Sequence, residues 1–222
     1  MDITLYSREK GFGAPLVLLH GNGEDGTYFE HQIEYFSRRY RVIAVDTRGH
    51  GRSPKGDKPF CLDTFAEDLN SFFNYSGLEA AHVLGFSDGG NMALIFALRH
   101  QEKLKSLILN GANLFPDGMT DDVHREIREQ YEKFRENGDT ENMDLFRLML
   151  NEPDINPKEL ENIAVPTLVI AGNRDMIKYE HTRLIAESIP GADLKIIPGS
   201  HFIAAENPVQ FNSAVNSFLS GI

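Results

Sequence analysis

The 222-residue sequence has one cysteine, no tryptophan and far fewer basic than acidic residues. The single thiol, Cys61, has no partner for an internal disulfide, and no group of Cys and His residues has the spacing of a structural zinc site. With 22 basic and 33 acidic residues the formal net charge is −11, a sign that repels phosphate backbones and anionic lipid headgroups. These deficits exclude a disulfide scaffold and argue against nucleic acid and membrane surfaces as partners.

Long hydrophobic runs and targeting segments are also missing. The longest apolar runs, such as Leu16 to Leu19, are far shorter than the roughly 20 residues that cross a bilayer. The N-terminus begins with a strand-like stretch from Ile3 to Tyr6, not with a basic region followed by an apolar signal segment. We therefore expect a cytoplasmic protein, and the lone cysteine is typical of that reducing compartment.

The composition is that of an ordinary globular protein, 41% hydrophobic and 25% charged, and the length is typical of one domain. Short continuous apolar runs, typical of strands covered on both faces, alternate with helical patterns. Strands are expected at 15–19, 41–45, 81–84, 104–109, 166–171 and 193–197, and helices at 28–38, 62–75, 91–100, 182–188 and 208–219. This alternation predicts an α/β fold with a mostly parallel, twisted sheet of about seven strands and helices on both faces.

One segment interrupts the alternation. Residues 113–162 contain no strand pattern, only two helical patterns at 121–136 and 141–150, and they hold 14 acidic but 6 basic residues. We interpret the segment as a small helical cap inserted into a core formed by residues 1–112 and 163–222, and its charge as that of a solvated helical face. Its apolar side chains could line a pocket, but we expect most of them to be core: Phe115, Met119, Phe134, Leu145, Phe146 and Met149.

The sequence Gly85-Phe86-Ser87-Asp88-Gly89 lies between a predicted strand and a predicted helix. This G-x-S-x-G pattern is that of a nucleophile elbow, in which the serine occupies a strained turn and projects its hydroxyl above the sheet. The two flanking glycines allow neighbouring backbone to approach closely. Ser87 is therefore the candidate nucleophile.

Three further turns follow predicted strands and carry groups that acyl transfer requires. The glycine-rich turn after residue 19 exposes backbone amides, and we expect the amides of Asn22 and Asp88 to face a developing oxyanion. Asp175 follows the strand at 166–171, and His201 follows the strand at 193–197. Because the carboxyl ends of parallel strands meet at one edge of a sheet, these groups are expected to lie together.

The chain order Ser87, Asp175, His201 is the order known for this sheet topology. Through these residues, His20-Gly21 and the segment from Asp46 to Ser53, the chain resembles the α/β-hydrolase superfamily over nearly its whole length. It departs in having one strand before the strand at 15–19, where the family usually has a hairpin. The Ser-Asp-Gly-Gly elbow and the segment 110–113 are similar to the valacyclovirase (biphenyl hydrolase-like) branch.

The resemblance implies a carboxylesterase-like serine hydrolase that cleaves a small ester or related acyl bond. Ser87 attacks the acyl carbon, His201 acts as general base and Asp175 orients His201. This chemistry requires no metal or organic cofactor, and the expected partner is a small-molecule ester. The branch resemblance also implies that Asp88 anchors the ammonium group of amino-acid esters, although a role at the helix start explains that carboxylate equally well.

Alternatives to an esterase stay open. The same serine could hydrolyse a lactone or thioester, or use hydrogen peroxide to form peracids, and a non-catalytic hydrolase-like binding protein would keep the pocket without turnover. A group of polar residues near the predicted site is assigned to structure, namely His20, Asp46, Arg48 and His50, and His181 and Cys61 receive no role. Nothing in the sequence predicts an oligomeric state.

Overall fold

A seven-stranded sheet forms the centre of the protein in the computed structural model, which describes residues 2–222. The strands follow the order β1-β3-β2-β4-β5-β6-β7, and β1 alone runs antiparallel to its neighbour, β3. Their bounds are β1 (Ser7–Lys10), β2 (Ala14–Leu19), β3 (Tyr40–Val45), β4 (Ala81–Phe86), β5 (Leu104–Asn110), β6 (Thr167–Gly172) and β7 (Asp193–Ile197). The predicted mostly parallel sheet is confirmed.

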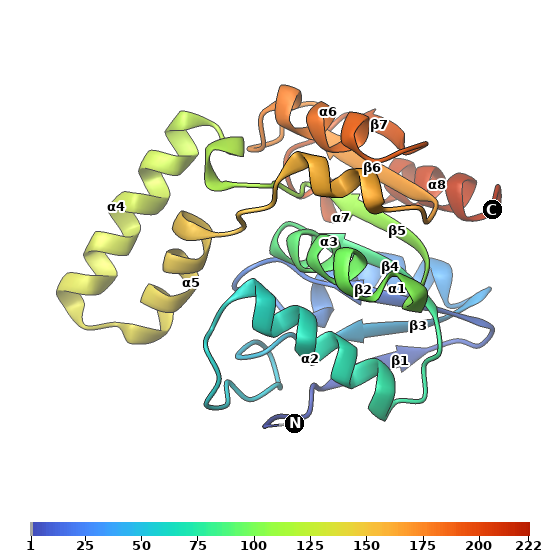
Figure 1. Ribbon diagram of the computed structural model, residues 1–222, viewed down its shortest axis with the longest axis horizontal. Coiled ribbons are helices and arrows are strands. Elements are labelled where there is room, and N and C mark those ends of the chain that lie inside the picture. The colour runs from blue at the N-terminus through green and yellow to red at the C-terminus, as the bar shows by residue number, and fades with distance from the viewer. Residues whose placement is uncertain (1) are drawn as a thin grey trace.

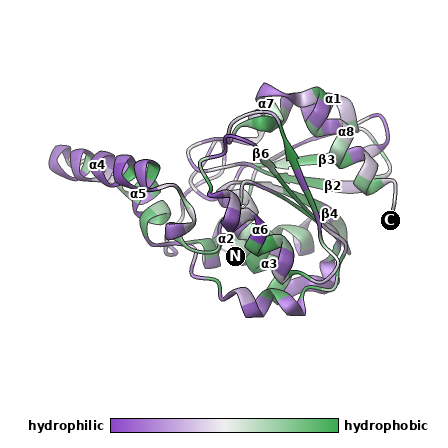
Figure 2. Cartoon of the chain, turned by 90° about the horizontal axis from the view of Figure 1, so that it is seen from above, coloured by the Kyte–Doolittle hydropathy of each residue, from purple (hydrophilic) through white to green (hydrophobic). Residues whose placement is uncertain are grey.

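Helices cover both faces of the sheet, as Figures 1 and 2 show. One face carries α2 (Leu62–Tyr75), α3 (Asp88–His100) and α6 (Tyr179–Ser188), and the other carries α1 (Glu30–Phe36), α7 (Ile203–Glu206) and α8 (Pro208–Leu219). Side chains along β2 alternate between the two cores: Val17 and Leu19 pack with α2 and α3, whereas Leu16 and Leu18 pack with α1 and α8. Burial on both faces explains why this strand is continuously apolar.

A helical hairpin stands at one end of the sheet, between β5 and β6 (Figure 1). It consists of α4 (Asp121–Asn137) and α5 (Thr140–Asn151), joined through Gly138 in the left-handed conformation. Four 3-10 helices complete the chain: η1 (Gly26–Phe29), η2 (Gln101–Lys103), η3 (Pro116–Gly118) and η4 (Pro157–Asn162). In α4 only Ile127 is buried, which accounts for the many charges of that helix.

The apolar side chains of this segment pack mainly among themselves. Phe146 and Met149 pack against the buried Met119, Ile127 and Ile177. The ring of Phe134 contacts Phe146, and the ring of Phe115 packs against His181. Most of the side chains considered as pocket lining are therefore core of the hairpin and its base.

The N-terminal prediction is wrong in register. The segment from Ile3 to Tyr6 forms no strand, and β1 begins at Ser7. Ile3 and Leu5 are instead buried against the core beneath α2, and the Tyr6 amide donates to Ser53 Oγ at 2.8 Å. The segment shows the strand period because its apolar residues alternate, but it reaches the sheet only at Tyr6, whose carbonyl accepts the Asp46 amide at 2.9 Å. The helix after the elbow also starts earlier than predicted, at Asp88.

Among residues 2–222, no helix is both long and apolar enough to pass through a membrane.

Candidate active site

Ser87 occupies a strained turn between β4 and α3. Its φ of 53° and ψ of −123° make it the only non-glycine residue with positive φ in the described chain. A Cβ at Gly85 would lie 2.3 Å from the Gly89 carbonyl oxygen, and one at Gly89 would lie 2.2 Å from the Leu19 carbonyl oxygen. Glycine is therefore required on both sides of the serine. The Ser87 amide donates to the carbonyl of Asn110 at 2.8 Å, which ties the turn to the end of β5.

The turns after β6 and β7 bring a carboxylate and an imidazole to this serine. His201 Nε2 lies 3.0 Å from Ser87 Oγ, and His201 Nδ1 lies 2.7 Å from Asp175 Oδ1. The Asp175 side chain is 3% exposed, and its Oδ1 also accepts the amide of Ile177 at 2.9 Å. The three side chains, separated by up to 114 positions in sequence, thus form one hydrogen-bonded chain. In this geometry the imidazole can take the serine proton while the carboxylate holds the opposite ring nitrogen.

Two backbone amides beside Ser87 are suitable for binding an oxyanion. Asp88 is the first residue of α3, so its amide has no carbonyl one turn earlier in the helix to bond. The amide of Asn22 donates to no group in residues 2–222. It lies in the turn from Gly21 to Glu24, where Gly23 has a φ of +73°. Both amides are therefore free to donate to a negative oxygen.

The Asp88 carboxylate is almost without hydrogen-bond donors. Oδ1 accepts the side-chain amide of Asn91 at 3.1 Å, whereas Oδ2 is buried and has no partner in residues 2–222. No backbone amide of α3 bonds the carboxylate, so it does not cap the helix by a hydrogen bond. Burial raises the pKa of Asp88 to about 6, and the nearby side-chain amides of Asn91 and Asn22 oppose this rise. The Asn22 side chain acts on the pKa from nearby but forms no hydrogen bond with Oδ2.

A cavity of about 10 Å³, roughly the space of one water molecule, lies beside this carboxylate. Its lining includes Asn22, His50, Asp88 and Leu148, and Leu148 comes from α5 of the hairpin. The Asn22 side-chain nitrogen donates to the carbonyl of Leu145 at 2.9 Å, which fixes Asn22 Oδ1 as an acceptor that has no partner in the described chain.

His50 supplies a further acceptor to the same cavity. Burial lowers its pKa, so the ring is neutral at pH 7. Nδ1 lies 2.9 Å from the Arg48 carbonyl oxygen, which can only accept, so Nδ1 carries the proton and Nε2 carries a lone pair. Nε2 is buried without a partner in residues 2–222. Three of the residues that line the cavity, Asn22, His50 and Asp88, therefore each carry an unpartnered acceptor.

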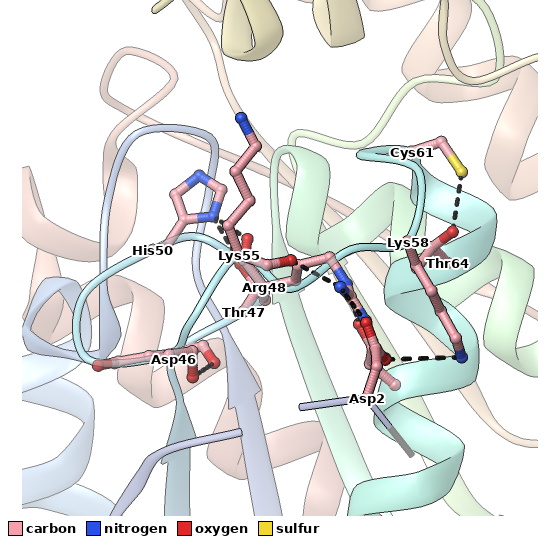
Figure 3. A network of polar contacts seen from close by, with 11 residues as sticks. Asp2, Asp46, Thr47, Arg48, His50, Lys55, Lys58, Cys61 and Thr64 are labelled. Atoms are coloured by element: carbon pink, nitrogen blue, oxygen red, sulfur yellow. Dashed lines mark hydrogen bonds and ion pairs between the residues drawn. The ribbon is translucent and has the colours of Figure 1, made fainter. Parts of the chain in front are cut away.

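The other polar residues near the site hold its loops in place, as Figure 3 shows around Arg48. Arg48 is fully buried and pairs with Asp68 through Nε at 2.6 Å and with Asp2 through Nη2 at 2.9 Å. Asp46 accepts the amides of Gly26 and Arg52. His20 donates through Nδ1 to the Gly21 carbonyl and accepts the Thr47 amide through Nε2 at 3.0 Å, and burial lowers its pKa to about 4. These contacts agree with the structural role assigned to His20, Asp46 and Arg48.

Sequence reasoning gave no role to two residues that accept backbone amides, one near Leu114 at the base of the hairpin and one in the turn that carries Asn22. His181 accepts the Leu114 amide through Nε2 at 2.8 Å, and burial lowers its pKa to about 4. Glu24 accepts the Gly21 amide at 3.1 Å within the turn from Gly21 to Glu24, which presents the Asn22 amide. Neither residue belongs to a motif, although the position of Glu24 directly after the glycine-rich turn is a signal that could have been used. Cys61 contacts only Thr64 through its thiol. Within residues 2–222, no group of His, Cys, Asp and Glu could hold a metal ion.

A parallel α/β sheet with a serine elbow, an acid and a histidine at its carboxyl edge defines the class of the α/β hydrolases. Residues 14–142 match the family described as alpha/beta hydrolase fold, and the chain belongs to this family. The predicted family resemblance is confirmed, and the seven-stranded sheet with one strand before β2 is its form in this chain.

Named relatives extend over nearly the whole chain. "Putative carbamate hydrolase RutD" from Caulobacter sp. is 31% identical over 93% of this chain and 90% of the relative. The human "Serine hydrolase BPHL" is 26% identical over 98% of this chain and 83% of the relative. The structure of a thermophilic esterase from Thermogutta terrifontis is similar with a TM-score of 0.82 and 25% identity, covering 99% and 94% of the two chains. Membership of this family supports a hydrolase activity on a small molecule.

Proposed function

We propose that the protein is a serine hydrolase that cleaves a small carboxylic ester or related acyl bond through an acyl-serine intermediate. The observation that carries this proposal is the hydrogen-bonded chain from Ser87 through His201 to Asp175, with both distances within hydrogen-bond reach. In this proposal the segment 113–162 is a cap over the site of a core formed by residues 1–112 and 163–222.

The proposed reaction begins when Ser87 Oγ attacks the acyl carbon and His201 Nε2 takes the hydroxyl proton. The carbonyl oxygen becomes an oxyanion that accepts the amides of Asn22 and Asp88, and each such donor is worth on the order of 3 kcal/mol of transition-state stabilisation. His201 then returns the proton to the leaving oxygen as the ester bond breaks. A water molecule that gives its proton to His201 next attacks the acyl-serine, and His201 returns that proton to Ser87 Oγ as the bond between Ser87 and the acyl group breaks and the acid is released.

Reaction with a fluorophosphonate, which phosphonylates an activated serine, tests the proposal. We expect stoichiometric labelling of the wild type, no labelling of Ser87→Ala, and hydrolysis of p-nitrophenyl esters by the wild type alone. A folded wild type that neither reacts with the probe nor turns over an ester would instead favour a hydrolase-like binding protein.

Kinetic measurements distinguish ester hydrolysis from the other acyl-transfer reactions that the same serine could catalyse. A panel of p-nitrophenyl esters, a lactone and a thioester, assayed with and without hydrogen peroxide, distinguishes hydrolysis from peracid formation. The enol-lactonase of Acinetobacter baylyi and a chloroperoxidase of Kitasatospora aureofaciens, 25% and 27% identical to this chain, motivate those two arms of the panel.

We further propose that the site favours esters bearing a primary amine. Three residues that line the cavity next to Asp88 each carry an unpartnered acceptor: Oδ2 of Asp88, Oδ1 of Asn22 and Nε2 of His50. A protonated primary amine has three N–H donors and a positive charge, whereas a water molecule has two donors and leaves one acceptor unsatisfied. A buried acceptor without a donor costs about 1–3 kcal/mol, so a ligand that satisfies all three gains affinity.

A further inference from the structure

The turn that presents the Asn22 amide is closed twice by one residue, Glu24. The backbone amide of Glu24 donates to the Gly21 carbonyl at 3.3 Å, which closes the four-residue turn. The Glu24 carboxylate accepts the Gly21 amide at 3.1 Å, which closes the same turn from its other end. Asn22 lies between these two hydrogen bonds, so the direction of its amide depends on both.

The Glu24 carboxylate lies near Phe86, a residue whose ring contacts the catalytic imidazole. A Cβ at Gly21 would lie 3.1 Å from Glu24 Oε2 and 3.0 Å from the ring of Phe86. That Phe86 ring packs against the His201 imidazole, with centroids 4.8 Å apart. Glu24 thus lies where the turn from Gly21 to Glu24 approaches the end of β4, and the end of β4 in turn contacts His201.

The charges around Glu24 make its ionisation depend on the site. Burial raises the pKa of Glu24 to about 7, the Gly21 amide and the charge of His201 lower it, and the neighbouring Asp25 raises it. Tyr28 stacks on Phe86 with ring centroids 4.4 Å apart, and burial, together with the charges of Glu24, Glu206 and Asp175, raises its pKa far above the usual range. Among the groups whose charge affects the pKa of Glu24, His201 is therefore the cation.

We propose that Glu24 is a positioning residue for catalysis, which holds the Asn22 amide toward the oxyanion and places a negative charge beside the imidazolium that His201 becomes. The proposal rests on the acyl-serine mechanism proposed above. The two effects act at the same moment, because the oxyanion and the imidazolium form together when Ser87 loses its proton. A neutral Glu24 carboxyl supplies neither a charge for the imidazolium nor a strong acceptor for the Gly21 amide.

Two substitutions separate the effects, assayed with an uncharged p-nitrophenyl ester. Glu24→Gln keeps an acceptor for the Gly21 amide but removes the charge, and we expect kcat to fall about tenfold. Glu24→Ala removes both, and we expect kcat to fall on the order of 100-fold, the scale of losing one oxyanion donor. KM is expected to change less than about threefold, because the ground-state ester carries no charge for these groups to stabilise.

The pH profile gives a readout that a purely structural role would not change. In the wild type, protonation of Glu24 removes the same charge as Glu24→Gln, so it should lower kcat/KM about tenfold in addition to the acid-side loss that follows protonation of the general base His201. In Glu24→Gln this additional tenfold step is expected to be absent, and log kcat/KM should fall with the slope of a single group, near 1. Asp25→Asn is the matched control, because it removes a charge one residue away and asparagine is an equally good cap for η1. Loss of the Asp25 charge lowers the pKa of Glu24, so the tenfold step should move to lower pH while its size is kept and kcat stays within about twofold.

The outcomes distinguish a failure of the proposed role of Glu24 from a failure of the proposed serine hydrolase activity. A wild type that is not labelled by the fluorophosphonate and hydrolyses no ester overturns both. A wild type that turns over esters while Glu24→Gln keeps the wild-type kcat and the wild-type pH profile overturns the role of Glu24 alone. If Glu24→Ala does not fold, Glu24→Gln, similar in size and hydrogen bonding, decides the question. Equal losses in Glu24→Gln and Asp25→Asn would also refute the proposal, because they would reflect charge in general.

Discussion

The proposed preference for primary amines gives the most specific prediction. The perturbation combines the variant Asp88→Asn with a series of substrates: L-alanine benzyl ester, its N-methyl, N,N-dimethyl and N,N,N-trimethyl forms, and benzyl propionate, which lacks the nitrogen. Asparagine keeps the size of the side chain but removes the negative charge beside the cavity. The methyl groups remove N–H donors one at a time while the positive charge remains.

The magnitude follows from the contacts around Asp88. A hydrogen bond to a charged group is worth about 1.5–3 kcal/mol, so Asp88→Asn should lower kcat/KM for alanine benzyl ester by about 10- to 150-fold more than for benzyl propionate. Each lost donor leaves one of the three acceptors without a partner, at about 1–3 kcal/mol. In addition, a cavity of about 10 Å³ has no room for three methyl groups. The wild type should therefore lose activity stepwise along the methyl series.

Chromatographic detection of benzyl alcohol measures all five esters in one assay and is independent of the charge of the acyl group. Glu129→Gln is the matched control, because Glu129 is exposed on α4 and its loss changes the net charge by the same amount. The control should keep the wild-type ratio between the charged and uncharged esters. Equal losses on alanine ester and propionate in Asp88→Asn, or full activity on the trimethyl ester, would refute the reasoning.

Three further predictions concern stability and geometry. Because burial raises the pKa of Asp88 to about 6, the folded state holds that proton more tightly than the unfolded chain. The free energy of unfolding of the wild type should therefore fall by about 3 kcal/mol between pH 4 and 7, whereas Asp88→Asn should not show this fall; denaturant unfolding measures both. The pKa shift of His181 has the opposite sign, because burial lowers the pKa of this residue to about 4. The free energy of unfolding should therefore fall as pH decreases from about 6.5 to 4, and His181→Gln should reduce this loss by about 3 kcal/mol in the same titration. Gly111→Ala places a Cβ 2.7 Å from His201 Cε1 and should lower kcat on the order of 100-fold while circular dichroism stays native; an unchanged kcat would show that the imidazole position is not so restricted.

Local sequence patterns were sufficient to predict the sheet and to place the side chains of Ser87, Asp175 and His201 at one edge of it. The predicted strand ends and the helices at 62–75 and 208–219 agree with the structure because buried parallel strands and amphipathic helices each leave a distinct period in the sequence. Ser87 directly follows β4, and Asp175 and His201 lie in the turns after β6 and β7, so the rule that parallel strands end at one edge was enough to bring them together.

The parts that could not be predicted depend on contacts between distant segments. The acceptor role of Asn22 Oδ1 follows from a bond between the Asn22 side chain and the Leu145 carbonyl, 123 positions away, which no local pattern encodes. The tautomer of His50 depends on the carbonyl of Arg48, and the cavity is lined by Leu148 rather than by the neighbouring apolar residues considered earlier. The helix period predicts which side of α5 is apolar but not which residue reaches the site.

The bond from the Asn22 side chain to the Leu145 carbonyl joins the turn that presents the oxyanion amide to the hairpin above it. A second tie connects Lys55, on the loop that carries His50, to Asp144 of the same helix. Tilting the hairpin to admit a larger molecule would therefore pull on Asn22 and on the loop of His50 together. Enlarging the entrance and preserving the reaction rate are opposing demands in this protein, and exchanging the hairpin for a relative's would alter turnover as well as selectivity.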